Sequence, residues 1–511
     1  MPISKLTLLV SLFWCAIANA QVANRFDVVI SEIMADPSPQ VGLPNAEYIE
    51  IKNVSTTPIS LTGWRLSDAT SSATITATIV LQPDSFLIVC ANSNVAALSN
   101  FGRTIGISSF PGLDNDGDQL TLRSNQGRMI HAVAYSTEWY GNEIKRDGGW
   151  SLEMIDTKNP CSGMNNWIAS VDASGGTPGK KNSVDAINID QTPPQLVRTY
   201  SIDSITLVAV FDEPLDSASA SLITNYSLQG FAIASATPQL PLFNRVVLQL
   251  GSSMQRRVVY PLTVTAVRDC KNNSIGAFNT SKAGWSEEAT TSDVIINEIL
   301  FNPKPNGFDY VEIYNNTNKI IDAAKLFVAN RNSTGGISSP KKLSETPFFI
   351  FPGDYLVVTE NAAAIKNNYF VQNPKHLLAQ SSLPSYPDDK GTVIVTNSQG
   401  NVVDEVAYSN KWHFALINNE EGIALERIDP AGSSQDGSNW HSAASTAGYG
   451  TPTFKNSQYK QGLAVNATIE VIPKIFSPDN DGRDDFATIV YQVTEPGYVA
   501  NISIFDGSGR L

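Results

Sequence analysis

The feature that most constrains this chain of 511 residues is an internal repeat. Residues 28–37 read VVISEIMADP and residues 294–303 read VIINEILFNP, while EYIEIKN at 47–53 returns as DYVEIYN at 309–315. The order continues through a Pro-led strand, a Gly-containing turn, and Val-Ala-Tyr, Leu-Glu and Asn-Trp sequences, and it closes with Gly-Thr-Pro at 176–178 and 450–452. Chance does not produce so many ordered matches. The chain therefore carries two copies of one domain of about 160 residues.

Both copies are predicted to be β. Short runs rich in β-branched and apolar residues, such as 28–30, 48–51 and 120–122, lie between turns of Asn, Asp, Gly and Pro. Helical candidates are short, at residues 94–100 and 362–368. The pattern predicts an all-β protein made of sandwiches or barrels.

Several motifs resemble the lamin tail domain family. They are the opening V-I-S-E-I-x-x-x-P, the strand EYIEIKN, the segment LTGWRLSD at 61–68 and the terminal Gly-Thr-Pro-Gly. The resemblance covers residues 27–183 and 293–457; the second copy departs from it at Lys325-Leu326, where the first has Gly-Trp. It implies tandem Ig-like β-sandwich domains in a secreted bacterial protein. The family carries no catalytic motif, so the resemblance transfers no active-site residue.

Two other regions resemble extracellular modules. Residues 211–216 read FDEPLD, followed by NYSL at 225–228 and YPLTVTAVRD at 260–269, and this order is similar to the Ig-like domain of bacterial S-layer proteins. Residues 473–486 read PKIFSPDNDGRDDF, with strands predicted at 487–493 and 500–505. This end resembles the start of Ig-like C-terminal domains of gliding-associated surface proteins, some of which precede a type IX secretion signal. Two or three strands do not close a sandwich, so we expect the natural protein to continue or this copy to be truncated.

The first twenty residues have the form of a signal peptide. Lys5 supplies the positive charge, residues 6–17 the apolar stretch, and Ala18-Asn19-Ala20 the cleavage site. No later segment reaches the roughly 20 apolar residues of a membrane helix. The predicted domains are then 1–20, a signal peptide; 21–184, the first lamin-tail-like sandwich; 190–288, the S-layer-type domain; 290–459, the second lamin-tail-like sandwich; and 466–511, an incomplete Ig-like segment. We expect a secreted or outer-surface protein.

Charge and cysteine content limit the partners and the chemistry. The formal net charge of −14 makes the chain a poor nonspecific binder of nucleic acid, so no nucleic-acid partner is expected. After the leader, Cys90, Cys161 and Cys270 remain, and their spacing matches no metal-ligand pattern. The odd number leaves at least one thiol unpaired in a monomer, and the spacing does not decide whether one disulfide forms.

Sequence motifs of catalysis are absent. There is no G-x-S-x-G, H-E-x-x-H, G-x-x-x-x-G-K-[ST] or G-x-G-x-x-G pattern. Of the four histidines, His131 is replaced by Asp404 in the second copy, which disfavours a base required by both copies. Carboxylates recur in both copies at Glu32/Glu298, Glu47/Asp309, Glu50/Glu312 and Glu153/Glu426. A pair such as Glu32 and Glu50 is either an acid–base or metal-ligand pair, or a set of acceptors for loop backbone; the second interpretation is favoured.

Two acidic turns and several tryptophans are candidate binding features. Asp479, Asp481, Asp484 and Asp485 place oxygens around a Gly turn, as a Ca²⁺ loop would, although Val490 stands where an EF-hand has its Glu. Residues 114–118 read DNDGD and form a similar, weaker candidate; the alternative for both is a solvated Asx turn. The tryptophans at 64, 139, 150 and 167 suggest a carbohydrate platform, but two of them recur in the second copy as core or edge packing predicts.

The sequence therefore favours a non-catalytic, exported multidomain scaffold or adhesion protein. Its partner would be a protein or polysaccharide at the cell surface, with no cofactor other than a candidate Ca²⁺. One alternative is the stalk of a longer secreted nuclease or phosphatase whose catalytic domain lies beyond residue 511. The other is a carbohydrate- or polymer-binding module.

Overall fold

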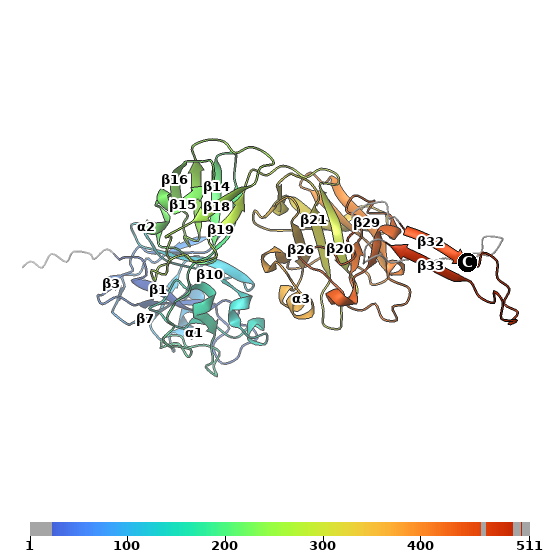
Figure 1. Ribbon diagram of the computed structural model, residues 1–511. Helices are drawn as coiled ribbons and strands as arrows, with labels where there is room; N and C mark the ends of the chain where they lie inside the picture. Colours follow the sequence, from blue (N-terminus) through green and yellow to red (C-terminus); the bar gives the residue numbers. More distant parts are fainter. Residues whose placement is uncertain (1–22, 461–466, 494–501, 503–511) are drawn as a thin grey trace, which may run out of the picture. The chain divides into compact units, whose positions relative to one another are not determined.

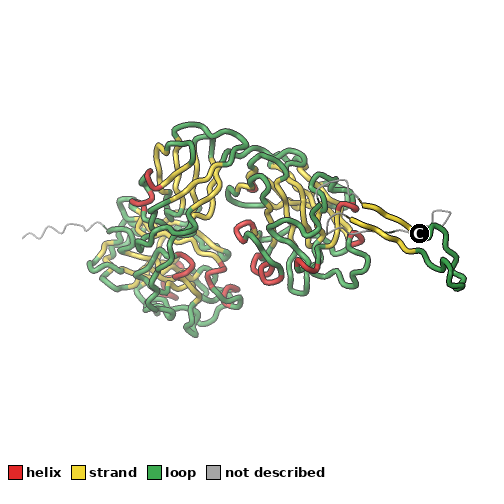
Figure 2. Tube along the Cα trace, viewed as in Figure 1, coloured by secondary structure: helices red, strands yellow, loops and turns green. Residues whose placement is uncertain are grey.

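The computed structural model describes residues 23–460, 467–493 and 502, and its strands fall into several sheets that are mainly antiparallel, with one parallel pair in each of the two largest (Figure 1). The predicted signal peptide at 1–20 and the predicted strand at 500–505 are not settled, because almost all of these residues lie outside the described part. The chain divides into two compact units, Met1–Glu287 and Glu288–Leu511. Figure 2 shows how little helix accompanies the strands. No described helix is long and apolar enough to cross a membrane.

The first unit begins with a two-sheet sandwich. Its larger sheet has the order β12-β11-β1-β2-β7-β8 and its smaller sheet the order β10-β9-β4-β5, beside the short pair β3-β6. The strands of this sandwich are β1 (Val28–Met34), β2 (Tyr48–Asn53), β3 (Ile59–Ser60), β4 (Arg65–Ser67), β5 (Ser72–Thr74), β6 (Val80–Leu81), β7 (Phe86–Ala91), β8 (Thr104–Ile107), β9 (Gly117–Arg123), β10 (Met129–Ser136), β11 (Leu152–Met154) and β12 (Trp167–Ala169). Its one α-helix is α1 (Val95–Leu98).

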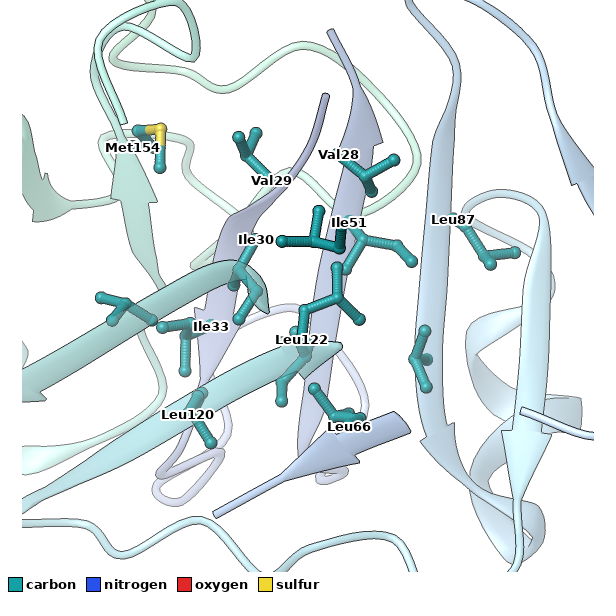
Figure 3. Packing of buried hydrophobic residues seen from close by; sticks show 14 of the residues in the cluster. Val28, Val29, Ile30, Ile33, Ile51, Leu66, Leu87, Leu120, Leu122 and Met154 are labelled. Carbon is teal, nitrogen blue, oxygen red and sulfur yellow. The ribbon is translucent and has the colours of Figure 1, made fainter. Parts of the chain in front are cut away.

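Apolar side chains from both sheets fill the space between them. Ile30, Ile51 and Leu87 from the larger sheet face Leu66 and Leu122 from the smaller one, and all five are buried (Figure 3). Alternation along each strand sends every second side chain to this core. The predicted all-β, Ig-like sandwich is therefore confirmed.

The opposite face of the larger sheet is also covered. Met34, Tyr48, Ile88 and Cys90 are buried there against Leu98 of α1. Loops and the segment that closes the domain take part in covering this face, which explains why β1 is buried along its whole length. A strand buried on both faces keeps no polar side chain in water, and the carboxylates on this face must find partners inside the protein.

A smaller sandwich completes the first unit. Its sheets have the orders β13-β14-β17-β16 and β15-β18-β19. Its elements are β13 (Leu196–Ser201), β14 (Thr206–Phe211), α2 (Ser217–Ala220), β15 (Tyr226–Leu228), β16 (Ile233–Pro238), β17 (Arg245–Leu250), β18 (Tyr260–Val264) and β19 (Thr280–Ala283). The motif residues Phe211, Tyr226 and Leu262 are all buried in its core.

The second unit repeats the first sandwich strand for strand. Its sheets have the orders β31-β30-β20-β21-β26-β27 and β29-β28-β23-β24, beside the pair β22-β25. The elements are β20 (Val294–Leu300), β21 (Tyr310–Asn315), β22 (Ile321–Asp322), β23 (Leu326–Arg331), β24 (Ile337–Lys342), β25 (Phe349–Ile350), β26 (Tyr355–Thr359), α3 (Ala362–Asn368), β27 (Leu377–Ala379), β28 (Lys390–Asn397), β29 (Val402–Ser409), β30 (Leu425–Arg427) and β31 (Trp440–Ser442). Where the first copy buries Trp64, the second buries Leu326, so the departure from the family pattern is absorbed by the core.

The described part of the C-terminal segment is a hairpin of β32 (Ala467–Ile472) and β33 (Thr488–Val493). The acidic turn predicted to bind Ca²⁺ lies between these strands. The domain boundaries given above stay a prediction.

Candidate functional site

Three glutamates lie side by side on the larger sheet of the first sandwich. Glu32 on β1 is paired in register with Glu50 on β2 and with Glu153 on β11. All three side chains are fully buried. A β-bulge between Ile30 and Glu32 shifts the register of β1, so Glu32 leaves the core side of the strand. We call these three residues the first carboxylate cluster.

The first cluster holds the segment that closes the domain, residues 176–184, which we call the first strap. Thr177 donates its backbone N–H to Glu32 Oε1 at 2.8 Å and approaches Glu153 Oε1 with its hydroxyl at 2.8 Å. Ser183 donates its hydroxyl to Glu153 Oε2 at 2.7 Å. The Gly-Thr-Pro motif recurs because its threonine reaches two of the carboxylates at once.

Other donors complete the cluster from within the sheet and the strap. The Gly179 N–H donates to Glu50 Oε2, and the hydroxyl of Ser31, the bulge residue, donates to Glu50 Oε1 at 3.0 Å. Tyr48 donates its hydroxyl to Glu32 Oε1 at 2.6 Å. The carboxylate oxygens of the cluster thus face protein donors rather than solvent.

The second sandwich has the same arrangement in Glu298, Glu312 and Glu426, the second carboxylate cluster, and all three are buried. The second strap is residues 450–458. Thr451 donates its N–H to Glu298 Oε1 at 2.9 Å, and its hydroxyl lies 2.8 Å from Glu426 Oε1. Asn297 takes the place of the bulge serine and donates to Glu312 Oε1 at 2.8 Å.

Burial governs the protonation of these groups. Loss of solvent, followed by repulsion from Glu153, raises the pKa of Glu32 to about 7, and the same causes, with Glu426 as neighbour, raise the pKa of Glu298 to about 8. Desolvation also raises the pKa of Glu50 and Glu312 well above the usual range. Such values suit acid–base chemistry, but the carboxyls are closed off from any substrate by their own straps. The acceptor interpretation of the recurring glutamates agrees with this geometry.

The other recurring carboxylates and the histidines do not join the clusters. Glu47 is only partly buried and accepts the Leu113 N–H at 3.2 Å. His131 is buried, and its Nδ1 accepts the Ile30 N–H at 3.0 Å. Desolvation lowers the pKa of both His131 and His413 to about 4, so both rings are neutral at neutral pH.

The tryptophans pack rather than form a platform. Trp167 and Trp440 are buried, and each contacts another tryptophan of its own domain. The ring centroids are 6.1 Å apart for Trp139–Trp167 and 6.3 Å apart for Trp412–Trp440. Trp64 is a core residue. This is the outcome that recurrence at domain anchors favoured.

The predicted Ca²⁺ turn brings three of its four carboxylates together. Oxygens of Asp479, Asp481 and Asp485 lie within 4.8 Å of one another, and Asp484 is not part of the group. Backbone N–H groups already use these carboxylates: Asp485 accepts from Asn480 at 2.7 Å, and Asp481 accepts from Arg483 at 2.8 Å, as an Asx-type turn does. The weaker candidate at 114–118 does not form such a group of carboxylates among the described residues.

A second acidic group was not predicted. Asp190, Glu213 and Asp269 come within 4.8 Å of one another in the first unit. Desolvation and the neighbouring Asp190 and Asp269 raise the pKa of Glu213 to about 8. The three residues are far apart in sequence and share no spacing signal. The only sign of them was the acidic character of the FDEPLD and AVRD motifs.

A disulfide decides the question left open by the cysteine count. Cys161 in the first sandwich and Cys270 in the smaller sandwich are bonded, with Cα atoms 6.4 Å apart. Cys90 stays a buried thiol whose pKa is raised to about 11 by desolvation. The smaller sandwich is therefore covalently tied to the first one.

Comparison with known proteins identifies the repeated domain. The Lamin Tail Domain family matches residues 21–137 and 287–410. No curated protein matches the chain. Among solved structures, the N-terminal part of the bacterial S-layer protein SbsC is 15% identical, with a TM-score of 0.18, over 43% of this chain and 44% of that one. This chain thus spans less than half of that S-layer structure.

Two further solved structures are similar to parts of this chain. A DUF4876 family protein from Bacteroides thetaiotaomicron is 13% identical, with a TM-score of 0.20, over 51% of this chain and 93% of its own. The adhesin InvE from Yersinia pseudotuberculosis is 11% identical, with a TM-score of 0.16, over 46% of this chain and 67% of its own. The sequence match and the two equivalent sandwiches agree: this chain contains the lamin tail domain twice.

Proposed function

We propose that this protein is a non-catalytic scaffold or adhesion protein of the cell surface or extracellular space. The proposal rests on one observation: the carboxylates common to both lamin tail domains bind segments of their own domain. Glu32 and Glu298 are buried, and both bind the straps that close their own domains. The chemistry that the two copies share thus stabilises the fold.

The cysteine chemistry supports the proposed compartment. Disulfides persist in oxidising compartments and are rare in the cytosol. The Cys161–Cys270 bond fits export, as does the signal-like leader.

Location and activity can be tested separately. Intact cells that produce the protein are treated with a protease too large to enter them, and digestion of the chain is expected. The purified full chain is then incubated with single-stranded DNA, double-stranded DNA and a phosphate monoester. No turnover above that of buffer is expected. Turnover that survives repurification would contradict the non-catalytic assignment, and protection on intact cells would contradict the location.

We also propose that the turn carrying Asp479, Asp481 and Asp485 binds Ca²⁺. Three carboxylates within 4.8 Å supply part of the six to eight oxygens that Ca²⁺ prefers, and water and Asp484 are available for others. Calcium should slow proteolysis within residues 473–487 of the full chain, and EDTA should reverse this effect. Asp481→Asn should abolish the protection, whereas Asp116→Asn in the other acidic turn should leave it intact. Equal cleavage rates in Ca²⁺ and EDTA would rule the site out.

A further inference from the structure

The hydroxyl of Thr451 lies between two carboxyl groups. Thr451 Oγ1 is 2.9 Å from Glu298 Oε2 and 2.8 Å from Glu426 Oε1. A hydroxyl has a single hydrogen and can donate to only one of these oxygens. If both glutamates were ionised, the other contact would set two lone pairs against each other at hydrogen-bond distance. One of the two carboxyls must therefore carry a proton and donate it to Thr451 Oγ1.

The remaining oxygens show where this proton lies. Glu298 Oε1 accepts from the Thr451 N–H at 2.9 Å and from the Tyr310 hydroxyl at 2.5 Å. Glu426 Oε2 accepts from the Ser457 hydroxyl and the Gln458 N–H, each at 2.7 Å. Both of these oxygens face donors only. The proton is left on Glu298 Oε2 or Glu426 Oε1, the two oxygens that face the threonine hydroxyl.

The titratable groups that face Glu298 add no positive charge. They are Glu426 on β30, Glu312 and Tyr310 on β21, and Tyr369, which follows α3. The neighbouring Arg427 is paired with Asp404 instead. Three buried carboxyls with no facing cation repel one another when ionised, and a shared proton relieves this repulsion.

The first domain has the same three residues in a looser arrangement. Thr177 Oγ1 lies 2.8 Å from Glu153 Oε1 and 3.5 Å from Glu32 Oε2. The groups that face Glu32 are Glu153, Glu50 and Tyr48, again without a cation. The threonine and both glutamates recur in the two copies, but the contact to Glu32 is longer than an ordinary O–H···O bond. The second domain therefore carries the geometric argument, and the proposal extends to the first domain through the shared residues.

We propose that each lamin tail domain is fastened by one proton, shared by the two carboxyls that its strap threonine bridges, and that loss of this proton as the pH rises from mildly acidic to slightly alkaline values loosens the strap. The strap is the segment through which the chain leaves the domain, so the proton controls how firmly the next segment is attached. This device stands on the bridge geometry alone and does not depend on the proposed scaffold function.

The direction of the pH dependence follows from the raised pKa of Glu32, about 7, and of Glu298, about 8. The folded state keeps a proton that the unfolded chain loses near the ordinary value of about 4.5. The stability of each strap is therefore highest in mild acid, falls as the pH rises from about 4.5 to about 7–8, and stays low above that range.

Hydrogen exchange of the full chain tests the proposal. Exchange of the strap amides at 176–184 and 450–458 is measured from about pH 6 to about pH 9 and corrected for the intrinsic rate of each amide. We expect both straps to open up to about tenfold more often per pH unit while the proton is being lost. Corrected protection that does not change with pH in the wild-type chain would overturn the proposal.

The variant Glu426→Gln sharpens the test. Its amide supplies a permanent N–H donor to Thr451 Oγ1, so the pH dependence of the second strap should become weaker while the first strap keeps its own. The remaining dependence comes from Glu312, whose pKa is still raised by burial. Glu345→Gln, at a side chain that is 75% exposed, is the matched control and should change neither strap. A second strap in Glu426→Gln that keeps the wild-type pH dependence would overturn the proposal.

A spectroscopic readout decides the matter if Glu426→Gln does not fold. The infrared spectrum of the wild-type chain in heavy water at neutral pH should contain the carbonyl band of protonated carboxylic acids. This band should disappear as the pH rises through about 7–8, the range in which the fall in strap protection comes to an end. A neutral-pH spectrum without the band would overturn the proposal.

Discussion

The two lamin tail domains use different side chains as the acceptor for the same buried backbone N–H. At the bulge of the first domain, the Ile30 N–H donates to the neutral ring of His131 at 3.0 Å. At the same place in the second domain, the Ile296 N–H donates to Asp404 Oδ2 at 2.7 Å. A buried N–H requires an acceptor, and the bulge leaves this one without a strand partner. The fold demands an acceptor here and not a particular charge.

The change of acceptor explains a second difference. Met154 ends β11 in the first domain, where the second domain has the buried Arg427. Arg427 lies 3.1 Å from Asp404 and donates its Nε–H to the Ile296 carbonyl at 2.7 Å. A neutral histidine needs no counter-ion, but a buried aspartate does. The carboxylate clusters and their straps are the same in both domains, which indicates that the fold depends on them.

The largest expected effect comes from replacing Arg427 alone and keeping Asp404, although both residues differ between the two domains. Arg427→Met leaves Asp404 buried and unpaired, and should lower the free energy of unfolding by about 3–5 kcal/mol. Asp404→His together with Arg427→Met reproduces the pair His131/Met154 and should recover part of the loss. The stability of both variants is measured by hydrogen exchange of the β20 amides in the full chain. If the double variant is no more stable than the single one, the two acceptors are not equivalent.

The disulfide offers the next test, since the second domain has Ser434 where the first has Cys161. That serine donates its hydroxyl to Asp404. The bond Cys161–Cys270 closes a loop with a sequence separation of 109 residues. Replacing both cysteines by serine should lower the free energy of unfolding of the first unit by about 2–4 kcal/mol. Reduction of the wild-type chain should produce the same loss, and denaturant unfolding measures both.

Reduction also provides the control for that experiment. The double serine variant should not respond to a reductant, and the second unit should not respond in either protein. A reductant that destabilises the variant as much as the wild type would show that the loss does not come from this disulfide.

A smaller effect is expected from removing the neutral acceptor. His131→Leu leaves the buried Ile30 N–H without its partner, at a cost of about 1–3 kcal/mol. Because burial lowers the pKa of His131 to about 4, the unfolded chain binds the proton first. The histidine's contribution is complete above pH 6.5 or so and is lost as the pH falls toward about 4.

The pH dependence separates this role from simple packing. The free energy of unfolding is measured at several acidic pH values by hydrogen exchange of the β1 amides. It should fall less steeply with decreasing pH in His131→Leu than in the wild type. Equal slopes in the two proteins would show that another group is responsible for the acid lability of the first domain.

Local features of the sequence predicted more than distant ones. The turns and strand patterns predicted both sandwiches, and the expected helix at 362–368 is α3. The recurring glutamates were visible as a pattern, but their role depends on Thr177 returning to Glu32 across 145 positions. The group of Asp190, Glu213 and Asp269 depends on tertiary contact in the same way. Nor does the spacing of three cysteines decide which two pair.

The smallest expected effect concerns an ion pair that only the second domain has. Lys319 lies 2.5 Å from Asp293, and both side chains are mostly buried, while Thr57 stands at the equivalent position of the first domain. Despite the cost of burial, the hydrogen bonds of Lys319 and Thr290 lower the pKa of Asp293. The pair therefore contributes above the ordinary aspartate pKa of about 3.9, and this contribution is lost as the pH falls below it.

Lys319→Thr copies the first domain and should lower the free energy of unfolding of the second domain by about 0.5–1 kcal/mol at neutral pH. The difference from wild type should vanish in acid, where Asp293 is protonated. Denaturant unfolding at the two pH values measures it, and Lys366→Thr on α3 serves as an exposed control. A loss well above this range would mean that Lys319 is required by the fold of the second domain, as the carboxylate clusters are, because a residue that Thr can replace would not cost so much.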